Sequence, residues 1–261
     1  MASADSSLSP LPVNAWVDAV YVLSVKAFTH RIDHVSRQLS QQGIAFEFMW
    51  THDANEIDDE MLANVFGSSG LKRTHQSLVL KHIQTWREAD VRGLQRILVF
   101  EDDVILATDF RTRFDQAMRA AKRLSQGYLI FLGGADTKVP DFYHLATEPL
   151  VPLPIATAEG YVTDLTAMRR RLEWLEANRV TLTADHLIRQ IDEHVGTAHY
   201  WLRRPIVEQG SVTGIFPSVL DRHRQKHSRW VNQLRYRWNK FQRHRLHGWL
   251  ARLKADWANR S

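Results

Sequence analysis

Apolar and polar positions follow two different rhythms along the first ninety residues. Residues 17–24 are mostly apolar and rich in β-branched side chains, which predicts a first strand. Residues 29–42 carry apolar side chains three and four positions apart and are followed by Gly43, which predicts a helix that ends there. The same two patterns predict a short strand at 45–50 and helices at 56–66 and 77–89.

The alternation continues through the rest of the body. We predict a strand over 97–100, a helix at 110–124, a strand at 128–132, and helices at 164–178 and 184–195. Four prolines between 140 and 154 indicate an irregular excursion, which we expect to be a loop over the active face. Strands that alternate with helices in this way predict an α/β fold.

The strand over 97–100 leads directly into three adjacent carboxylates, Glu101, Asp102 and Asp103, with no turn residue between them. Carboxylates this close repel one another and are costly to desolvate, so the triplet needs a cation or a cationic partner. Hard divalent cations take oxygen ligands, and Glu101 and Asp103 point the same way on an extended chain. The triplet therefore indicates a metal site.

The acidic triplet has other possible interpretations besides a metal site. A solvated acidic turn is the plainest alternative. A phosphatase of the aspartyl-phosphate type needs Asp-x-Asp, whereas Glu101 stands at the first position. A receiver domain carries its acidic pair near the N-terminus, whereas one hundred residues precede this one. The sequence also has no Gly-x-Gly-x-x-Gly, no phosphate loop and no His-Glu-x-x-His.

Composition limits the classes of protein that the chain can form. Its 261 residues are enough for one substantial core, with or without a small appendage. No run of eighteen apolar residues occurs, so we expect no transmembrane helix. Residues 1–12 are Ser/Pro-rich without a basic start, and we expect no secretory signal there. The absence of cysteine excludes disulfides and thiolate metal sites and is compatible with the cytoplasm.

Charge is distributed unevenly. Residues 1–221 contain 22 Lys and Arg against 28 Asp and Glu, whereas residues 222–261 contain 12 Lys and Arg against one Asp. We therefore predict three regions: a disordered leader at 1–14, a catalytic body at 15–221 and a basic tail at 222–261.

The tail combines basic residues with a repeating apolar pattern. Aromatic and leucine residues recur three or four positions apart from Trp230 to Trp257, with Arg and Lys between them, which predicts an amphipathic helical tail. Trp and Arg together suit the headgroup region of an anionic membrane, so we expect contact with the inner face of the cytoplasmic membrane. Packing of the same stripe on the body or on a second subunit is the alternative.

Several segments, taken in order, resemble glycosyltransferase family 25, which includes bacterial lipooligosaccharide and lipopolysaccharide galactosyltransferases. The similar segments span most of the body: VYVLSVK at 20–26, QQGIAFEF at 41–48, SLVLKH at 77–82, LVFEDDVIL at 98–106, AEGYV at 158–162, DH at 185–186 and PIVEQGS at 205–211. Two differences stand out, because Lys81 replaces the family's serine before the histidine and Thr183-Ala184 replaces Pro-Val before Asp185.

The resemblance implies a GT-A-like nucleotide-sugar-binding fold with a mostly parallel central sheet. It also implies an inverting hexosyltransferase that depends on a divalent cation, Mn²⁺ or Mg²⁺. The expected reaction moves galactose from uridine diphosphate galactose to a lipopolysaccharide or lipooligosaccharide acceptor. We expect a peripheral protein of the bacterial cytoplasm.

The acidic triplet and one later aspartate take the central roles in this prediction. Asp103 is expected to be the main metal ligand, with Glu101 beside it, and Asp102 is expected to face the ribose or sugar. Asp185 is the predicted general base for the acceptor hydroxyl, with Asp164 and Glu159 as reserves. A helix-capping role is the alternative for Asp185.

The remaining site residues are predicted to bind the substrates. His82 is expected to contact donor or acceptor, or else to pack against the sheet. Arg31 and Lys26 are expected to neutralise the diphosphate of the donor or to contact its nucleotide base, and ordinary surface positions are the alternative for both. Gln209, with Ser211, is expected to bind a sugar. Three tryptophans are candidates for stacking on sugar rings, although an internal tryptophan is more often simply a core residue: Trp50, Trp86 and Trp201.

The sequence is also compatible with two other classes of function. A non-catalytic carbohydrate-binding or adhesion module on the same fold is the alternative, and it would be favoured by a degenerate acidic motif. A nucleic-acid binder would use the basic tail, but the acidic body and the absence of a nucleic-acid-binding motif disfavour it. We expect no nucleic acid among the partners and leave an oligomer open.

Overall fold

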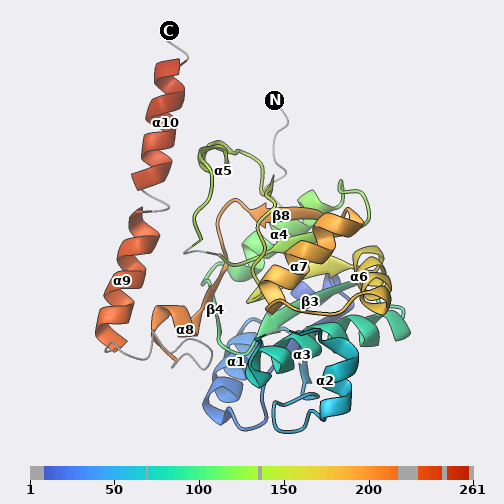
Figure 1. The fold of residues 1–261 in the computed structure, drawn as a ribbon. Helices are drawn as coiled ribbons and strands as arrows, with labels where there is room; N and C mark the ends of the chain where they lie inside the picture. The colour runs from blue at the N-terminus through green and yellow to red at the C-terminus, as the bar shows by residue number, and fades with distance from the viewer. Residues whose placement is uncertain (1–8, 69, 135–136, 217–228, 243–245, 259–261) are drawn as a thin grey trace.

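The computed structural model describes residues 9–68, 70–134, 137–216, 229–242 and 246–258, and its centre is a seven-stranded sheet (Figure 1). The strand order is β2-β1-β3-β7-β5-β8-β6. Their bounds are β1 Ala19–Leu23, β2 Glu47–Met49, β3 Arg96–Glu101, β5 Tyr128–Phe131, β6 Leu150–Pro152, β7 Gly160–Asp164 and β8 Ala198–Leu202. A separate two-stranded ribbon joins β4, Val104–Leu106, to β9, Val207–Gln209.

Five of the seven strands run in the same direction. β1 is parallel to β2 and β3, and β5 is parallel to β8, whereas β7 and β6 run the opposite way. The predicted α/β fold with a mostly parallel sheet is therefore confirmed. Because β1 and β3 are parallel neighbours, with Leu23 opposite Glu101, their carboxyl ends meet at one edge of the sheet.

Helices cover both faces of the sheet. α1 (Thr29–Gln41) and α4 (Phe110–Ala121) pack on one face, and α3 (Arg73–Val91), α6 (Leu165–Ala177) and α7 (Ala184–Val195) pack on the other. Alternate side chains of β1 belong to different clusters, since Val20 and Val22 lie with α1 and Tyr21 lies with α3. Both faces are buried, which explains why the strands are continuous apolar runs.

Two predictions about irregular segments were wrong in part. The predicted disordered leader extends too far, because residues 9–14 pack on the body: Val13 is buried in a 3-10 helix at Val13–Ala15, and the Leu11 amide donates to Asp115. Residues 1–8 of that leader lie outside the described residues. The expected loop at 140–154 contains helix α5, Asp141–Leu145, and edge strand β6, which pairs with β8.

Two further helices follow the body, α9 (Arg229–Phe241) and α10 (His247–Ala258), after the short α8 (Gly210–Thr213). In Figure 1 they lie one after the other at the side of the molecule that carries α8 and α5. Tyr236 of α9 and Gly248 and Ala251 of α10 are buried among the described residues, and Lys254 pairs with Asp141 of α5 at 2.8 Å. The predicted domain boundary at 221/222 lies outside the described residues.

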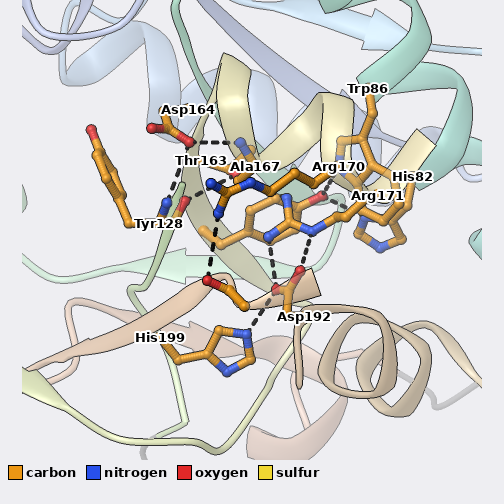
Figure 2. A network of polar contacts seen from close by, with 12 residues as sticks. His82, Trp86, Tyr128, Thr163, Asp164, Ala167, Arg170, Arg171, Asp192 and His199 are labelled. Carbon is orange, nitrogen blue, oxygen red and sulfur yellow. Dashed lines mark hydrogen bonds and ion pairs between the residues drawn. The ribbon is translucent and has the colours of Figure 1, made fainter. Parts of the chain in front are cut away.

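A buried polar network fixes the position of α7 (Figure 2). Arg171 of α6 donates to both carboxylate oxygens of Asp192 of α7, at 2.7 and 2.8 Å, and to the Thr163 hydroxyl of β7. His199 of β8 contacts the same carboxylate at 2.7 Å. Burial pushes the pKa of Asp192 up, but Arg171 and His199 more than offset it, so this pKa is lowered. One ion pair thus connects two strands and two helices.

Candidate functional site

The acidic triplet lies where β3 leaves the sheet, and its three carboxylates have different surroundings. Asp102 accepts hydrogen bonds from Arg31 at 2.9 Å and from the Ser24 hydroxyl at 2.8 Å. Glu101 accepts one from the Gln209 amide at 3.1 Å. Asp103 accepts one from the Ser211 backbone at 3.1 Å through Oδ2. The structure therefore brings together five residues that the sequence placed in the site, Glu101, Asp102, Asp103, Arg31 and Gln209.

Glu101 is held in an unfavourable electrostatic environment. Burial is the main reason that its pKa is raised well above the usual range, and the neighbouring charges of Asp103, Glu159 and Asp102 add to the effect. Glu159 accepts a hydrogen bond from the Gly134 amide, and a side chain at Gly133 would overlap that carboxylate. Negative charge is thus concentrated at the end of β3.

Glu101 and Asp103 fit the role of cation ligands. Asp103 is 2% exposed, and its Oδ1 has no hydrogen-bond partner among the described residues. A cation would satisfy that oxygen and relieve the repulsion at Glu101. Within the described part of the chain, no group of three or more His, Cys, Asp or Glu side chains is arranged to hold a metal. Two carboxylates suffice where substrate phosphates supply further oxygens.

Two adjoining cavities meet at Glu101. The first, which we call the triplet cavity, measures about 240 Å³ and is lined by Ser24, Arg31, Lys81 and Asp102 as well as Glu101. The second, the central cavity, measures about 340 Å³, and its walls include Glu101 and Asp185. Both volumes approach the range usual for small-molecule sites.

Lys81 of the triplet cavity is a buried cation. Its ammonium pairs with Asp53 at 2.7 Å and donates to the Thr51 carbonyl at 2.6 Å. Burial lowers the pKa of Lys81, against the opposing effect of Asp53. The triplet cavity is therefore lined by two cationic side chains, Arg31 and Lys81, as well as by Asp102 and Glu101.

Asp185 lies in the first turn of α7 and faces the central cavity. The Thr183 hydroxyl donates to its Oδ1 at 2.8 Å and orients the carboxylate. Glu159 lines the same cavity. Asp164 does not, because its carboxylate caps α6 through the Ala167 amide and accepts from the Gly127 amide (Figure 2). Two of the three candidates for the general base, Asp185 and Glu159, therefore line the central cavity together with Glu101.

Several predicted binding residues lie elsewhere. His82 is 1% exposed, its Nδ1 lies 2.9 Å from the Tyr161 hydroxyl, and burial lowers its pKa to about 3. It lines none of these cavities. Lys26 pairs with Glu56 at 2.6 Å on the surface. Trp86 and Trp201 are core residues, and Trp50 stacks on Phe48.

Sequence reasoning missed several cavity residues. Lys81 and Ser24 line the triplet cavity, and His75, Glu208 and Tyr236 line the central cavity. Ser24 could have been found, because it follows the first parallel strand as Asp102 follows the third. Tyr236 belongs to α9, and no local pattern connects that helix to the triplet.

Comparison with known proteins identifies the family. Residues 17–148 match the model of glycosyltransferase family 25, described as LPS biosynthesis protein. The chain belongs to this family.

Individual relatives are distant. The lipooligosaccharide biosynthesis protein lic2B of Haemophilus influenzae is 25% identical over 181 residues, which are 64% of this chain and 66% of that protein. The lacto-N-neotetraose biosynthesis glycosyltransferase LgtE of Neisseria meningitidis serogroup B is 26% identical, with 59% of each chain covered. The human inactive glycosyltransferase 25 family member 3 is 26% identical over 75% of this chain. The match spans about two fifths of the length of such animal relatives.

Proposed function

We propose that this chain is an inverting glycosyltransferase that moves a hexose from a nucleotide-sugar donor to an oligosaccharide acceptor. Galactose from uridine diphosphate galactose is the donor that we favour, and a lipopolysaccharide or lipooligosaccharide is the acceptor. One observation carries the proposal: Glu101 lines both the triplet cavity and the central cavity, and Asp185 lines the second of them. Family membership and the names of the two bacterial relatives support it.

The triplet cavity suits the donor in this proposal. Arg31 and Lys81 supply positive charge for phosphate oxygens. Asp102, oriented by Arg31 and Ser24, is placed to accept from ribose or sugar hydroxyls. Glu101 and Asp103 would hold Mn²⁺ or Mg²⁺, which when bound neutralises charge on the departing diphosphate. The other polar side chains of the triplet cavity orient the donor so that the acceptor can attack it from the central cavity. The sheet edge that presents them is what we expect of a GT-A-like fold.

The central cavity suits the acceptor. Inversion requires a base on the face of the donor sugar opposite the leaving group. Asp185 is our candidate: the Thr183 hydroxyl occupies Oδ1 at 2.8 Å, so Oδ2 is the oxygen that would take the acceptor hydroxyl proton. Gln209, fixed by Glu101, is positioned to contact a sugar beside it.

A non-catalytic carbohydrate-binding protein is the second candidate. It is favoured by the animal relatives, several of which are named inactive. Against it, all three carboxylates of the triplet are present here and engage Arg31, Gln209 and the Ser211 backbone. Turnover distinguishes the two candidates.

The test is release of nucleoside diphosphate from a panel of nucleotide sugars, with Mn²⁺ or Mg²⁺ and truncated lipopolysaccharide acceptors. We expect turnover with uridine diphosphate galactose. Asp103→Ala should abolish turnover and cation-dependent binding of uridine diphosphate. Asp185→Asn should lower kcat by about 10²–10⁴-fold while donor binding persists. Asp59→Asn, an exposed first-turn aspartate of α2 (Asp59–Val65), is the control. Silence with every donor, while donors still bind, would favour the second candidate.

We also propose that α9 and α10 hold the enzyme on an anionic membrane surface, on the cytoplasmic side. Their outward side chains are large and apolar: Leu234, Trp238, Phe241, Leu246, Trp249, Leu250, Leu253 and Trp257 are each at least 40% exposed. On a helical projection these positions fall on one side of each helix, opposite the buried Tyr236 of α9 and Ala251 of α10. No helix of the described residues is long and apolar enough to span a bilayer.

A further inference from the structure

A third cavity lies between the two C-terminal helices and the body. It measures about 470 Å³ and has walls from α4, α5, β9, α9 and α10 and from the segment after β8. We call it the basic cavity, because five of its lining residues are cationic: Arg113, Arg203, Arg204, Lys240 and Arg252. Among the described residues, Glu208 is the one carboxylate that lines it.

The positive charge of the basic cavity is only partly compensated within the described residues. Lys240 pairs with Glu208, and Arg113 pairs with the exposed Asp109 at 3.2 Å. Arg204 and Arg252 make no ion pair with any described residue. Arg113 is also tied by hydrogen bonds to the carbonyl groups of Arg204 and Pro205, at 2.5 and 2.7 Å. These bonds fix its guanidinium in the wall.

The cationic groups repel one another. Burial is the main cause of a lowered pKa at Arg113, and the charge of Arg204 adds to it against the opposing effect of Asp109. A body with a net negative charge thus places like charges together around one space. Such an arrangement favours an anion among these charges, and guanidinium groups match phosphate oxygens with pairs of hydrogen bonds.

The position of the basic cavity connects it to the central cavity. Glu208 of β9 lines both, and its neighbour Gln209 lines the central cavity. A saccharide that occupies the central cavity could therefore extend past β9 into the basic cavity. Tyr143 and Trp249 complete the walls and offer aromatic surface for a sugar ring.

We propose that the basic cavity binds a phosphate group of the acceptor saccharide, so that the enzyme selects phosphorylated acceptors. This inference rests on the proposed function for the identity of the saccharide, but the anion site itself does not require turnover. A membrane phospholipid could present the same phosphate chemistry, and the experiment therefore separates the two sources.

The test compares the full-length protein with Arg204→Gln/Arg252→Gln. The control, Arg87→Gln/Arg123→Gln, removes two exposed charges from α3 and from the segment after α4. Calorimetry measures binding of glucose 6-phosphate and of glucose, with uridine diphosphate present to fill phosphate sites of the triplet cavity. We expect glucose 6-phosphate to bind the wild type more tightly than glucose. The cavity variant should weaken that binding at least tenfold, since each lost charged contact contributes about that factor. The control should keep it.

Two results would overturn the proposal. One is an equal loss in the control, which would mean binding to net charge alone. The other is binding of the wild type to phosphatidic acid vesicles, but not to glucose 6-phosphate, that depends on Arg204 and Arg252. Because binding is measured without turnover, an inactive enzyme that still binds glucose 6-phosphate through this cavity would refute the proposed reaction and leave the anion site standing. With an active enzyme, the variant should also lower the preference in kcat/KM for phosphorylated over unphosphorylated acceptor.

Discussion

The three adjacent carboxylates at the end of β3 show how neighbouring residues of the same chemistry receive different tasks. The Asp102 carboxylate pairs with Arg31 and accepts a hydrogen bond from Ser24, yet burial still raises the pKa of Asp102. Glu101 has one amide donor, and Asp103 has two backbone contacts through the segment 210–211. The sequence identified the triplet because apolar residues precede it directly. It could not assign the partners, because these come from β1, α1 and β9, far away in the chain.

His82 provides a test at the residue scale. Its pKa is lowered to about 3 by burial, and the Trp86 indole donates to the Tyr161 hydroxyl, which leaves that hydroxyl to donate to the neutral imidazole. Unfolding releases a histidine that binds a proton near pH 6.5. Protonation therefore favours the unfolded state, and His82 stabilises the fold fully only above that pH. Between pH 7.5 and pH 5 the free energy of unfolding should fall by about 2 kcal/mol on this account.

The variant His82→Asn keeps an acceptor near Tyr161 but cannot titrate. It should be less stable than the wild type at pH 7.5, and the difference should narrow by about 2 kcal/mol at pH 5. Urea unfolding at both pH values measures this. Parallel curves for the two proteins would show that His82 does not carry the pH dependence.

At the scale of elements, the sequence predicted best those helices whose ends carry clear local signals. α7 begins and ends where the pattern predicts, because Gly196 stops it in a left-handed conformation. α6 follows Asp164, whose side chain caps it at the start of the predicted helix. α5 and β6 were missed because both are short, and β6 owes its pairing to β8, some fifty residues later. The direction of β7 is likewise set by its neighbours, so the pattern alone could not give it.

The network that joins α6 to α7 provides a test at this scale. Asp192→Asn leaves the Arg171 guanidinium buried without a counter-charge, and loss of one partner of a buried pair costs about 3–5 kcal/mol. Arg169→Gln on the same helix removes the exposed pair with Asp90 and should cost less than about 1 kcal/mol. Urea unfolding of both variants measures the contrast. Equal losses would mean that the buried pair contributes no more than a surface one.

For the whole molecule, the three cavities form a series. Glu101 is shared by the first two and Glu208 by the last two. The C-terminal helices provide walls for both the central and the basic cavity, through Tyr236 and Trp249 respectively. The difference in charge allowed the tail to be separated from the body in the sequence. The packing of the tail against the body, through small and buried residues, was not predictable from the apolar stripe. Most of that stripe lies on the opposite side of both helices, whereas Trp249 also reaches the basic cavity.

This geometry determines how the membrane proposal should be tested. Deleting the tail would also remove cavity walls, so substitution on the exposed side is the cleaner experiment. Each basic residue near an anionic leaflet contributes about 1 kcal/mol, and buried tryptophan adds to this. The wild type should therefore sediment with vesicles that contain phosphatidylglycerol and much less with pure phosphatidylcholine. Trp238→Ser/Leu253→Ser, which changes two exposed residues that line none of the cavities, should reduce the bound fraction strongly.

The control for that experiment is Leu11→Ser/Val91→Ser, which removes exposed apolar side chains from the body and should leave vesicle binding unchanged. Turnover on a short soluble acceptor reports separately on the catalytic body. A second copy of the chain is the competing occupant of the stripe. If the wild type is a dimer by analytical ultracentrifugation and Trp238→Ser/Leu253→Ser makes it monomeric without affecting vesicle binding, the stripe is a subunit interface. The enzyme then has to contact the membrane through another surface, and α9 and α10 no longer indicate on which side of the membrane it works.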